Sequence, residues 1–330
     1  MGQIQQPTDR KKQFSQDPHR LNSRKESSMP FVPAYLGLRE RGELEGRIEA
    51  LNKILKSCTL CPRQCQVDRL NGETGYCQAG NDLRLSSVFP HYGEEPPLVG
   101  RHGSGTIFLT HCNLRCVFCQ NYEISHLGRG ERVAIGQMSR HMVRLQEIGC
   151  HNINFVTPTQ YTPQIIAALP QAIELGLRVP LVYNCGGYES LEVIRLLDGV
   201  VDIYMPDTKF SSSEVAKRFC NAPDYPDVVK SILREMHRQV GDLTMDSRGV
   251  AERGLLIRHL VMPHGLAGTE DIMRFIAKEL SPHSYVNVMA QYRPVYRAAG
   301  FPDLNRSLTM EEFGEALEIA RKYGLHRGFE

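Results

Sequence analysis

Residues 106–119 have the sequence TIFLTHCNLRCVFC, a short apolar run followed at once by three cysteines. The run TIFLT (106–110) has the length and the β-branched and aromatic content of a buried strand. Cys112, Cys116 and Cys119 then follow at Cys-x3-Cys-x2-Cys spacing. Structural zinc and ferredoxin clusters normally take four protein ligands, so an isolated trio indicates a metal with one open coordination position. An open position predicts direct binding of a substrate.

The chain after this loop alternates short apolar runs with amphipathic stretches, as parallel strands joined by crossover helices do. Five further strands are predicted, at 152–156, 178–183, 201–205, 255–262 and 285–289. Helices are predicted at about 137–149, 163–176, 189–197, 226–240, 269–279 and 308–323. This repeat predicts an α/β fold of the partial (β/α)6 TIM-barrel type.

Polar groups follow the predicted strands at their carboxyl ends. They are the cysteine loop, Thr157 to Thr159, Asn184 and Cys185, Asp207 and Lys209, His264, and Gln291 to Arg293. Active sites of parallel barrels assemble on this rim, because the loops converge there above a packed interior. Loops are polar in any protein, so a single residue proves little, but the whole set predicts a site.

The CxxxCxxC motif after a first barrel strand resembles that of the radical S-adenosylmethionine (radical SAM) superfamily, over roughly residues 31–330. The resemblance implies that the three cysteines hold three irons of a [4Fe-4S] cluster. The fourth iron would bind S-adenosylmethionine, and one electron would cleave it to a 5'-deoxyadenosyl radical that abstracts hydrogen. Phe118 resembles the aromatic residue that packs beside the adenine. An electron donor such as flavodoxin or ferredoxin is implied.

Within that superfamily the chain most resembles the pyruvate formate-lyase activating enzyme and its uncharacterised relatives. The motif Asp207-x-Lys209 is similar to the Asp-Leu-Lys of the activating enzyme. By this resemblance Lys209 would meet the carboxylate of S-adenosylmethionine, whereas Asp207, Met205 and Asn184 would lie near a monovalent cation. Independently of the resemblance, a lysine beside a carboxylate is either an anion clamp or an ordinary ion pair.

Arg258, within the apolar strand IRHLVM, resembles an arginine of the corresponding strand of the activating enzyme. An arginine inside such a strand needs a buried anionic partner. We therefore include Arg258 among the cofactor-binding residues.

The sequence departs from the activating enzyme in two places. It has Thr157-Pro158-Thr159 where the activating enzymes have Gly-Gly-Glu to hold the amino group of S-adenosylmethionine. Backbone carbonyls or threonine hydroxyls would have to take that role. The activating enzyme also lacks a cysteine module at its amino terminus. Activation of a glycyl-radical protein is therefore one hypothesis, and modification of a small molecule or peptide is the alternative.

A second group of thiols, Cys58, Cys61, Cys65 and Cys77, lies within a Gly- and Pro-rich stretch of little periodicity. Four thiolates suit either tetrahedral zinc or a second iron–sulfur cluster, and the spacing does not choose between them. We favour a structural metal. The chain is thus divided into a disordered tail (1–29), a helix and cysteine-rich metal module (30–105) and the barrel with its final helix (106–330). The helix is predicted from the apolar spacing within 42–57.

The amino-acid composition limits the kinds of molecule that the protein is expected to bind. Lys and Arg number 39 against 37 Asp and Glu, so the net charge of +2 supports neither nucleic-acid nor membrane binding. Ten cysteines in 330 residues are too few for a disulfide scaffold. With no apolar span of about 18 residues and no secretion signal, we expect a cytoplasmic protein.

Two rival classes remain open. In the first, both cysteine groups hold zinc or electron-transfer clusters and the barrel is a non-catalytic docking platform. In the second, the protein is a zinc hydrolase, although no histidine lies at paired-ligand spacing beside a carboxylate. Cys150 and Cys220 are assigned no chemistry, because small buried thiols are ordinary core residues. Cys185 at the rim could contact a cation or a substrate.

Overall fold

The computed structural model describes residues 31–329. From Val32 onward the chain forms one compact unit. The tail predicted for residues 1–29 lies outside the described residues.

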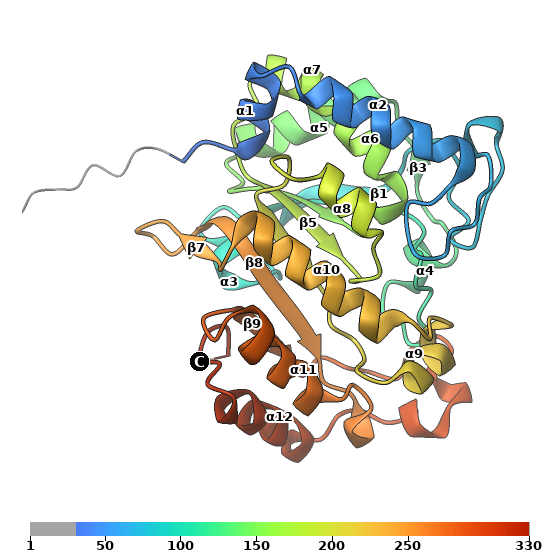
Figure 1. Ribbon diagram of the computed structural model, residues 1–330, viewed down its shortest axis with the longest axis vertical. Helices are drawn as coiled ribbons and strands as arrows, with labels where there is room; N and C mark the ends of the chain where they lie inside the picture. Colours follow the sequence, from blue (N-terminus) through green and yellow to red (C-terminus); the bar gives the residue numbers. More distant parts are fainter. Residues whose placement is uncertain (1–30, 330) are drawn as a thin grey trace, which may run out of the picture. The chain divides into compact units, whose positions relative to one another are not determined.

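A parallel sheet organises this unit (Figure 1). Its parallel strands are β2 (Ser104–Leu109), β4 (Ile153–Val156), β5 (Leu181–Cys185), β6 (Ile203–Pro206), β8 (Ala251–Leu260) and β9 (Tyr285–Met289). They pair in chain order, β2 with β4 and so on to β8 with β9. All six predicted strands are present, displaced by a few residues at some ends. The mixed α/β fold with a parallel sheet is confirmed and is consistent with a partial barrel.

Antiparallel strands extend both sides of the parallel set. They are β1 (Arg84–His91), β3 (Glu131–Arg132) and β7 (Thr244–Met245). Strand β1 pairs with β2, so the sheet crosses residue 105, where the sequence analysis placed a boundary. The sequence analysis predicted no strand here, because the one well-buried side chain of β1, Leu85, leaves no alternating pattern.

Helices cover the sheet, with α2, α5, α6 and α7 together in the upper part of Figure 1 and α10 across the middle. The helices are α1 (Ala34–Glu40), α2 (Leu44–Ile54), α3 (Pro96–Val99), α4 (Tyr122–Ser125), α5 (Ile135–Ile148), α6 (Thr162–Ala167), α7 (Leu169–Glu174), α8 (Leu191–Leu196), α9 (Ser213–Cys220), α10 (Tyr225–Val240), α11 (Thr269–Phe275) and α12 (Met310–Lys322).

The predicted helix at 163–176 is in fact two helices, α6 and α7. Pro170 lies in the first turn of α7, where its missing amide hydrogen costs little and its fixed φ suits a new start. Sequence periodicity alone did not reveal the break. The other predicted helices correspond to α2, α5, α8, α10, α11 and α12, and α11 continues as a π-helical turn at Ile276–Leu280.

The strands of the sheet are apolar because helices or loops bury them on both faces. Every residue of β5 and β6 is buried. Burial of each large aliphatic side chain contributes about 1.5–3 kcal/mol, so this core holds the strand ends in a fixed register. The residues at the carboxyl ends of the strands are therefore held in fixed positions by a rigid sheet.

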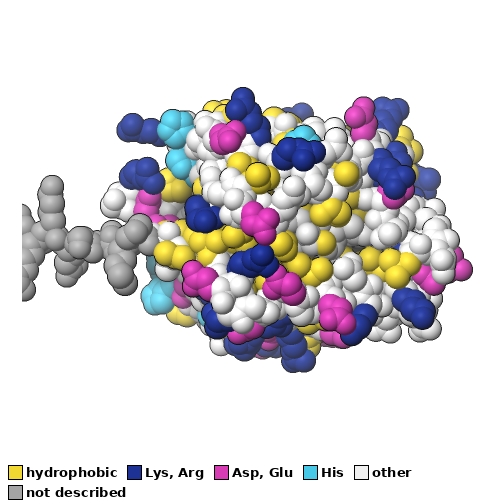
Figure 2. Space-filling model, turned by 90° about the horizontal axis from the view of Figure 1, so that it is seen from above, with side chains coloured by type: hydrophobic (Ala, Val, Ile, Leu, Met, Phe, Trp, Pro, Cys, Tyr) yellow, Lys and Arg dark blue, Asp and Glu magenta, His cyan; other side chains and the backbone are white. Residues whose placement is uncertain are grey.

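The face shown in Figure 2 carries basic and acidic side chains intermixed, with apolar atoms between them. This agrees with the small net charge. Among the described residues, no helix has the length and hydropathy needed to cross a membrane.

Candidate functional site

The loop after β2 carries the cysteine trio at the carboxyl edge of the parallel sheet. The backbone adopts left-handed φ angles at His111 (67°) and at Arg115 (51°). These two turns fold the loop sharply around its thiols. Non-glycine residues seldom take this conformation, and such strain is concentrated at functional sites.

Each thiol of the trio has a polar neighbour. The amide of Leu114 donates to Cys112 Sγ at 3.4 Å, and Cys119 Sγ lies 3.1 Å from the hydroxyl of Ser125. Cys116 Sγ lies 3.2 Å from Cys220 Sγ at the end of α9. N–H and O–H donors of this kind stabilise thiolates that ligate a metal.

Burial raises the pKa of the Cys112 thiol to about 12 and also raises the pKa of Cys119. The pKa of Cys116 is raised by its contact with Cys220 and by burial. Thiols in such surroundings ionise only when a metal ion supplies the compensating charge. Cys116 is buried and Cys112 and Cys119 are half-buried, and these three thiols on one loop match in number the donors of a cluster with an open iron.

Five predicted residues meet around one cavity of about 320 Å³ beside this loop. The cavity is lined by Cys116 and Cys119 together with Phe118, Asn184, Asp207, Lys209 and Arg258. They come from the cysteine loop and the ends of β5, β6 and β8. Cys112 lies in the same loop but does not line the cavity. The structure thus brings together residues that are up to 142 positions apart, the span from Cys116 to Arg258.

A network of charges forms the polar side of the cavity. Asp207 and Arg258 are bridge partners on neighbouring strands, and Arg258 Nε donates to Asp207 Oδ1 at 2.9 Å. Lys209 Nζ donates to Asp207 Oδ2 at 2.6 Å, and Arg258 Nη2 donates to Asn184 Oδ1 at 2.7 Å. Arg258 therefore has the anionic partner that its place in an apolar strand requires.

Electrostatics keep this network ionised. Burial opposes ionisation of Asp207, but Arg258 and Lys209 outweigh it and hold its pKa below the usual value. Burial would likewise lower the pKa of Lys209, yet Asp207 raises it. Both carboxylate oxygens of Asp207 and the amide oxygen of Asn184 are already occupied by protein donors. The predicted monovalent cation near Asp207 and Asn184 stays a prediction.

Glu94 and Glu95 approach Arg258 from the loop between β1 and β2. Their carboxylate oxygens lie 3.7 and 4.0 Å from Arg258 Nη1. Glu95 also accepts from Asn287 Nδ2 at 2.9 Å, whereas Glu94 lines the cavity. Burial raises the pKa of Glu94 to about 7 despite the nearby guanidinium of Arg258. The cavity thus contains one carboxyl group that can exchange a proton near neutrality.

Aromatic rings form the apolar side of the cavity. Phe118 is buried and packs against Phe210 and Tyr292, with ring centroids 6.0 and 5.9 Å apart. Tyr292 also lines the cavity. A flat apolar wall of this kind suits the face of a purine.

The threonine segment and Cys185 lie away from the cavity. Thr159 Oγ1 donates to the buried Glu189 at 2.8 Å, and Tyr183 OH donates to the same carboxylate at 3.1 Å. Neither Thr157, Thr159 nor Cys185 lines the cavity. Thr159 and Cys185 are buried and Thr157 is half-buried, so the predicted roles of these residues in binding S-adenosylmethionine, a cation or a substrate stay predictions.

Sequence reasoning missed several residues of this site. His91 lines the cavity and Cys220 touches Cys116, whereas Gln291 and Tyr292, which also line the cavity, belong to the predicted rim segment 291–293. The Glu94-Glu95 pair before Pro96-Pro97 was noticeable in the sequence, and a pair of acidic residues in an apolar setting was its signal. The position of Cys220 had none, because a lone cysteine in a helix has no informative spacing.

The second thiol group lies in the segment between α2 and β1. Cys58, Cys61, Cys65 and Cys77 line one small, largely apolar cavity. Among residues 31–329, no three His, Cys, Asp or Glu side chains converge as ligands of a single metal ion. That statement holds for both cysteine groups.

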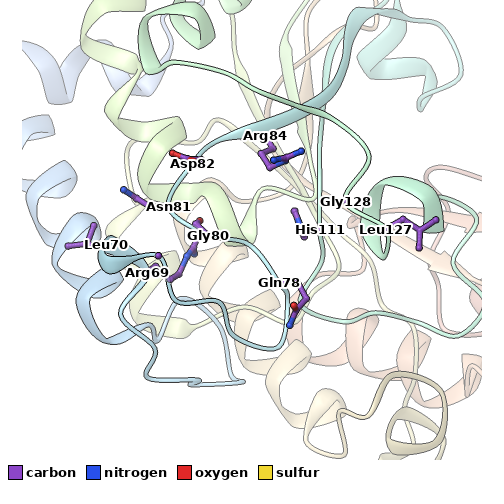
Figure 3. A pocket seen from close by; sticks show the side chains of 11 residues that line it. Arg69, Leu70, Gln78, Gly80, Asn81, Asp82, Arg84, His111, Leu127 and Gly128 are labelled. Atoms are coloured by element: carbon purple, nitrogen blue, oxygen red, sulfur yellow. The ribbon is translucent and has the colours of Figure 1, made fainter.

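An open pocket of about 550 Å³ lies on the other side of this segment (Figure 3). Arg69, Asn81, Arg84 and His111 are among its lining residues. It contains neither cysteine group, so we do not place the reaction there.

The fold and the cavity define a class: an α/β protein with a parallel sheet of the partial-barrel type, in which a three-cysteine loop at the carboxyl edge contributes Cys116 and Cys119 to a cavity. Residues 106–247 match the family model described as the radical SAM superfamily. The chain is 37% identical over 289 residues to the uncharacterized protein MJ0674 of Methanocaldococcus jannaschii, covering 86% of this chain and 79% of that protein. The chain therefore belongs to the same family as MJ0674, and its residues 106–247 are a radical SAM superfamily domain.

A solved structure with partial likeness is that of HydG, a maturase of the [FeFe]-hydrogenase. The two share 11% identity with a TM-score of 0.40, over 66% of this chain. The chain spans about half the length of that protein, 48%.

Proposed function

We propose that this protein cleaves S-adenosylmethionine reductively at a [4Fe-4S] cluster ligated by Cys112, Cys116 and Cys119. The observation that supports the proposal is that Cys116 and Cys119 of the trio line a cavity that also contains aromatic side chains and a group of charged side chains. When bound, the cluster and S-adenosylmethionine supply one-electron cleavage and a 5'-deoxyadenosyl radical that abstracts a hydrogen atom. The protein supplies placement and exclusion of water.

The cavity residues have separate tasks in this proposal. Phe118 and Tyr292 provide the apolar wall for the adenine. Lys209 lines the cavity and donates to the carboxylate of S-adenosylmethionine. Asp207 holds the ammonium group of Lys209 in place through their ion pair. Arg258 fixes Asp207 and Asn184. The positive charge expected from a monovalent cation is supplied here by Arg258.

Glu94 is placed to act on the substrate side. It is the one carboxyl of the cavity with a raised pKa, whereas Asp207 stays ionised. A neutral carboxyl can donate a hydrogen bond to a substrate, and its ionised form can accept one. Glu94 therefore takes the amino group of S-adenosylmethionine or a polar group of the substrate, a role that Thr157 and Thr159 do not fill.

The substrate class follows the resemblance at Asp207-x-Lys209. We propose a glycyl-radical protein as the hydrogen donor, with a flavodoxin or ferredoxin as electron donor. A small molecule or peptide is the alternative. Incubation with deuterated candidate substrates distinguishes them, because deuterium appears in 5'-deoxyadenosine only from the true donor.

The direct test of the proposed function is anaerobic reconstitution with iron and sulfide, followed by dithionite and S-adenosylmethionine. We expect stoichiometric or catalytic 5'-deoxyadenosine and methionine. Protein that contains a full trio cluster yet yields no 5'-deoxyadenosine would contradict the proposal.

A further inference from the structure

The carboxyl group of Glu94 lies in the cavity beside the cysteine loop and lacks a hydrogen-bond donor. Its side chain is 9% exposed and lines the cavity. Arg258 Nη1 lies 3.7 Å from Glu94 Oε2, which is too far for a hydrogen bond, and no N–H group of residues 31–329 donates to Glu94. A largely buried carboxyl group without a donor is costly, because it has lost hydration without compensation. A ligand that supplies a donor would remove this cost.

Glu95 adds a second carboxyl group with an unused oxygen. Its side chain is 4% exposed, and its Oε1 accepts from Asn287 Nδ2 at 2.9 Å. Its Oε2 is buried and has no hydrogen-bond partner in the described part of the chain. The carboxyl groups of Glu94 and Glu95 contact each other, and burial together with this contact raises the pKa of Glu94 to about 7. Two adjacent acceptor groups with so few donors suit a ligand that carries several N–H groups.

The charged groups around this pair leave an excess of negative charge. Three carboxyl groups stand against two basic groups, namely Glu94, Glu95 and Asp207 against Arg258 and Lys209. His91 also lines the cavity, but burial lowers its pKa, so it adds no positive charge near neutrality. The excess is removed either by a proton on Glu94 or by a cationic ligand.

Glu94 is separated from the place proposed for the amino-acid part of S-adenosylmethionine. Asp207 and Glu94 lie beside different edges of the Arg258 guanidinium, at Nε and at Nη1 respectively. Lys209 is on the Asp207 side, because its Nζ donates to Asp207 Oδ2. The amino and carboxylate groups of S-adenosylmethionine share one carbon atom, so both would bind near Lys209. Glu94 is thereby left for the second molecule, the hydrogen-atom donor.

Aromatic rings lie in the same cavity. His91 is the last residue of β1 and Phe108 belongs to β2; both line the cavity, with ring centroids 5.9 Å apart. The amide of Gly93 donates to His91 Nδ1 at 2.9 Å, and a Cβ at Gly93 would lie 2.7 Å from His91 Cε1, so a larger residue would displace the ring. Carboxylates together with aromatic faces bind organic cations through ion pairing and cation–π attraction.

We infer that the substrate of this protein carries an organic cation, an ammonium or guanidinium group, that binds to Glu94 and Glu95. The inference rests on the proposed function, from which it takes S-adenosylmethionine as the molecule at Lys209. The cation supplies the missing donors of both carboxyl groups and neutralises the excess negative charge. A free amine and a basic side chain of a peptide share this chemistry.

Binding of n-butylammonium and of its neutral counterpart butan-1-ol tests the inference on the full chain. Both probes are measured by equilibrium dialysis with reconstituted, oxidised protein saturated with S-adenosylmethionine, so that no turnover occurs. We expect butylammonium to bind at least about tenfold more tightly than butanol, because hydrogen bonds to charged groups are strong. Equal affinities would overturn the inference.

The variant Glu94→Gln keeps the shape of the side chain and removes its charge. The preference for butylammonium should fall below about threefold. Glu49→Gln, at a side chain that is 70% exposed, is the matched control and should keep the wild-type preference. An unchanged preference in Glu94→Gln would overturn the assignment of the cation to this carboxyl group.

The pH dependence of binding to the wild-type protein needs no variant. Butylammonium stays charged up to about pH 10, as a lysine side chain does, whereas Glu94 has its pKa at about 7. Ion pairs outweigh burial and hold the pKa of Asp207 low and those of Arg258 and Lys209 high, and His91 is uncharged in most of this range. The preference should rise by about fivefold or more between pH 6 and pH 8.5 as Glu94 ionises. A flat profile would overturn the role of Glu94.

The amide of N-acetyllysine distinguishes the two sources of the cation. Binding at least as tight as that of butylammonium assigns the cation to a peptide, and exclusion by size assigns it to a free amine; either result keeps the cation site. Formation of 5'-deoxyadenosine by the reduced protein, together with equal binding of butylammonium and butanol, would overturn the inference alone. A preference for butylammonium without any 5'-deoxyadenosine would contradict the proposed function alone.

Discussion

The two cysteine groups differ in the number of thiols and in what each cavity offers beside them. Two thiols of the trio, Cys116 and Cys119, line a cavity together with charged and aromatic side chains from several different parts of the chain. The four module thiols line a small apolar cavity formed mainly by their own segment, with a buried arginine beside it. The first arrangement leaves a coordination position and space for a ligand, and the second leaves neither.

This difference shows that the number of protein ligands decides whether a metal centre bound by thiolates can bind a substrate. Four protein ligands saturate a metal centre, so its environment can tune charge but cannot admit a substrate. Three ligands leave one iron of a cluster without a protein ligand. Only in that case can the other side chains of the cavity contact a molecule bound to the cluster. The following predictions test each side of the comparison.

The largest effect is expected for Cys116→Ala. Loss of one thiolate from a group of three should remove the trio cluster and lower 5'-deoxyadenosine formation by at least about 1,000-fold, because the cofactor carries the chemistry. Any metal bound by the module should be unaffected. Activity within tenfold of wild type would show that the trio is not the reactive centre.

A smaller effect is expected for Lys209→Met. A hydrogen bond to a charged group contributes about 1.5–3 kcal/mol, so binding of S-adenosylmethionine should weaken by roughly 10- to 100-fold. Lys53→Met, at a side chain that is 74% exposed on α2, is the matched control. Equilibrium binding to the reconstituted protein measures both. Equal affinities in the two variants would place the carboxylate elsewhere.

The next prediction concerns the pH dependence of the stability of the variant Glu94→Gln. The pKa of Glu94 is raised to about 7 in the folded protein, so the folded state binds more protons than the unfolded state between about pH 4.5 and 7. Stability from this group is present at low pH and is lost as the pH rises through that window. The variant should therefore lose less stability between pH 5 and pH 8 than wild type, by on the order of 1–2 kcal/mol.

Chemical denaturation at both pH values measures this difference. Glu49→Gln, at a side chain that is 70% exposed, should behave as wild type. Parallel pH profiles for Glu94→Gln and wild type would contradict a buried, protonated Glu94.

The smallest effect is expected for Cys220→Ala. Its thiol touches Cys116 but belongs to α9 and not to the cysteine loop, so we predict that it is a packing neighbour and not a fourth ligand. Loss of one buried sulfur should cost about 1 kcal/mol of stability and change 5'-deoxyadenosine formation by less than about threefold. A changed cluster spectrum in this variant would instead assign Cys220 to the metal.

Much of the barrel could be predicted because buried parallel strands are continuous apolar runs that end in polar residues. The placement of Asp207 and Lys209 at the rim follows from this pattern alone. Strand β1 could not be predicted, since only Leu85 among its residues is well buried. The split between α6 and α7 was likewise hidden, because the apolar spacing continues through Pro170.

The charge network was only partly accessible from sequence. Arg258 was recognisable as needing an anion, but its partners come from positions 94, 95, 184 and 207, which only the fold brings together. Arg69 gave no signal, because an arginine in a polar loop is normally exposed. Its burial depends on the packing of the whole cysteine segment.

The most direct test of the open iron uses S-adenosylmethionine labelled with 17O at its carboxylate. The label is added to the dithionite-reduced, reconstituted wild-type protein and studied by electron–nuclear double resonance. We predict hyperfine coupling from 17O to one cluster, and the same coupling in the variant with serine at all four module cysteines. Absence of any 17O coupling, with the trio cluster present and reduced, would contradict the account.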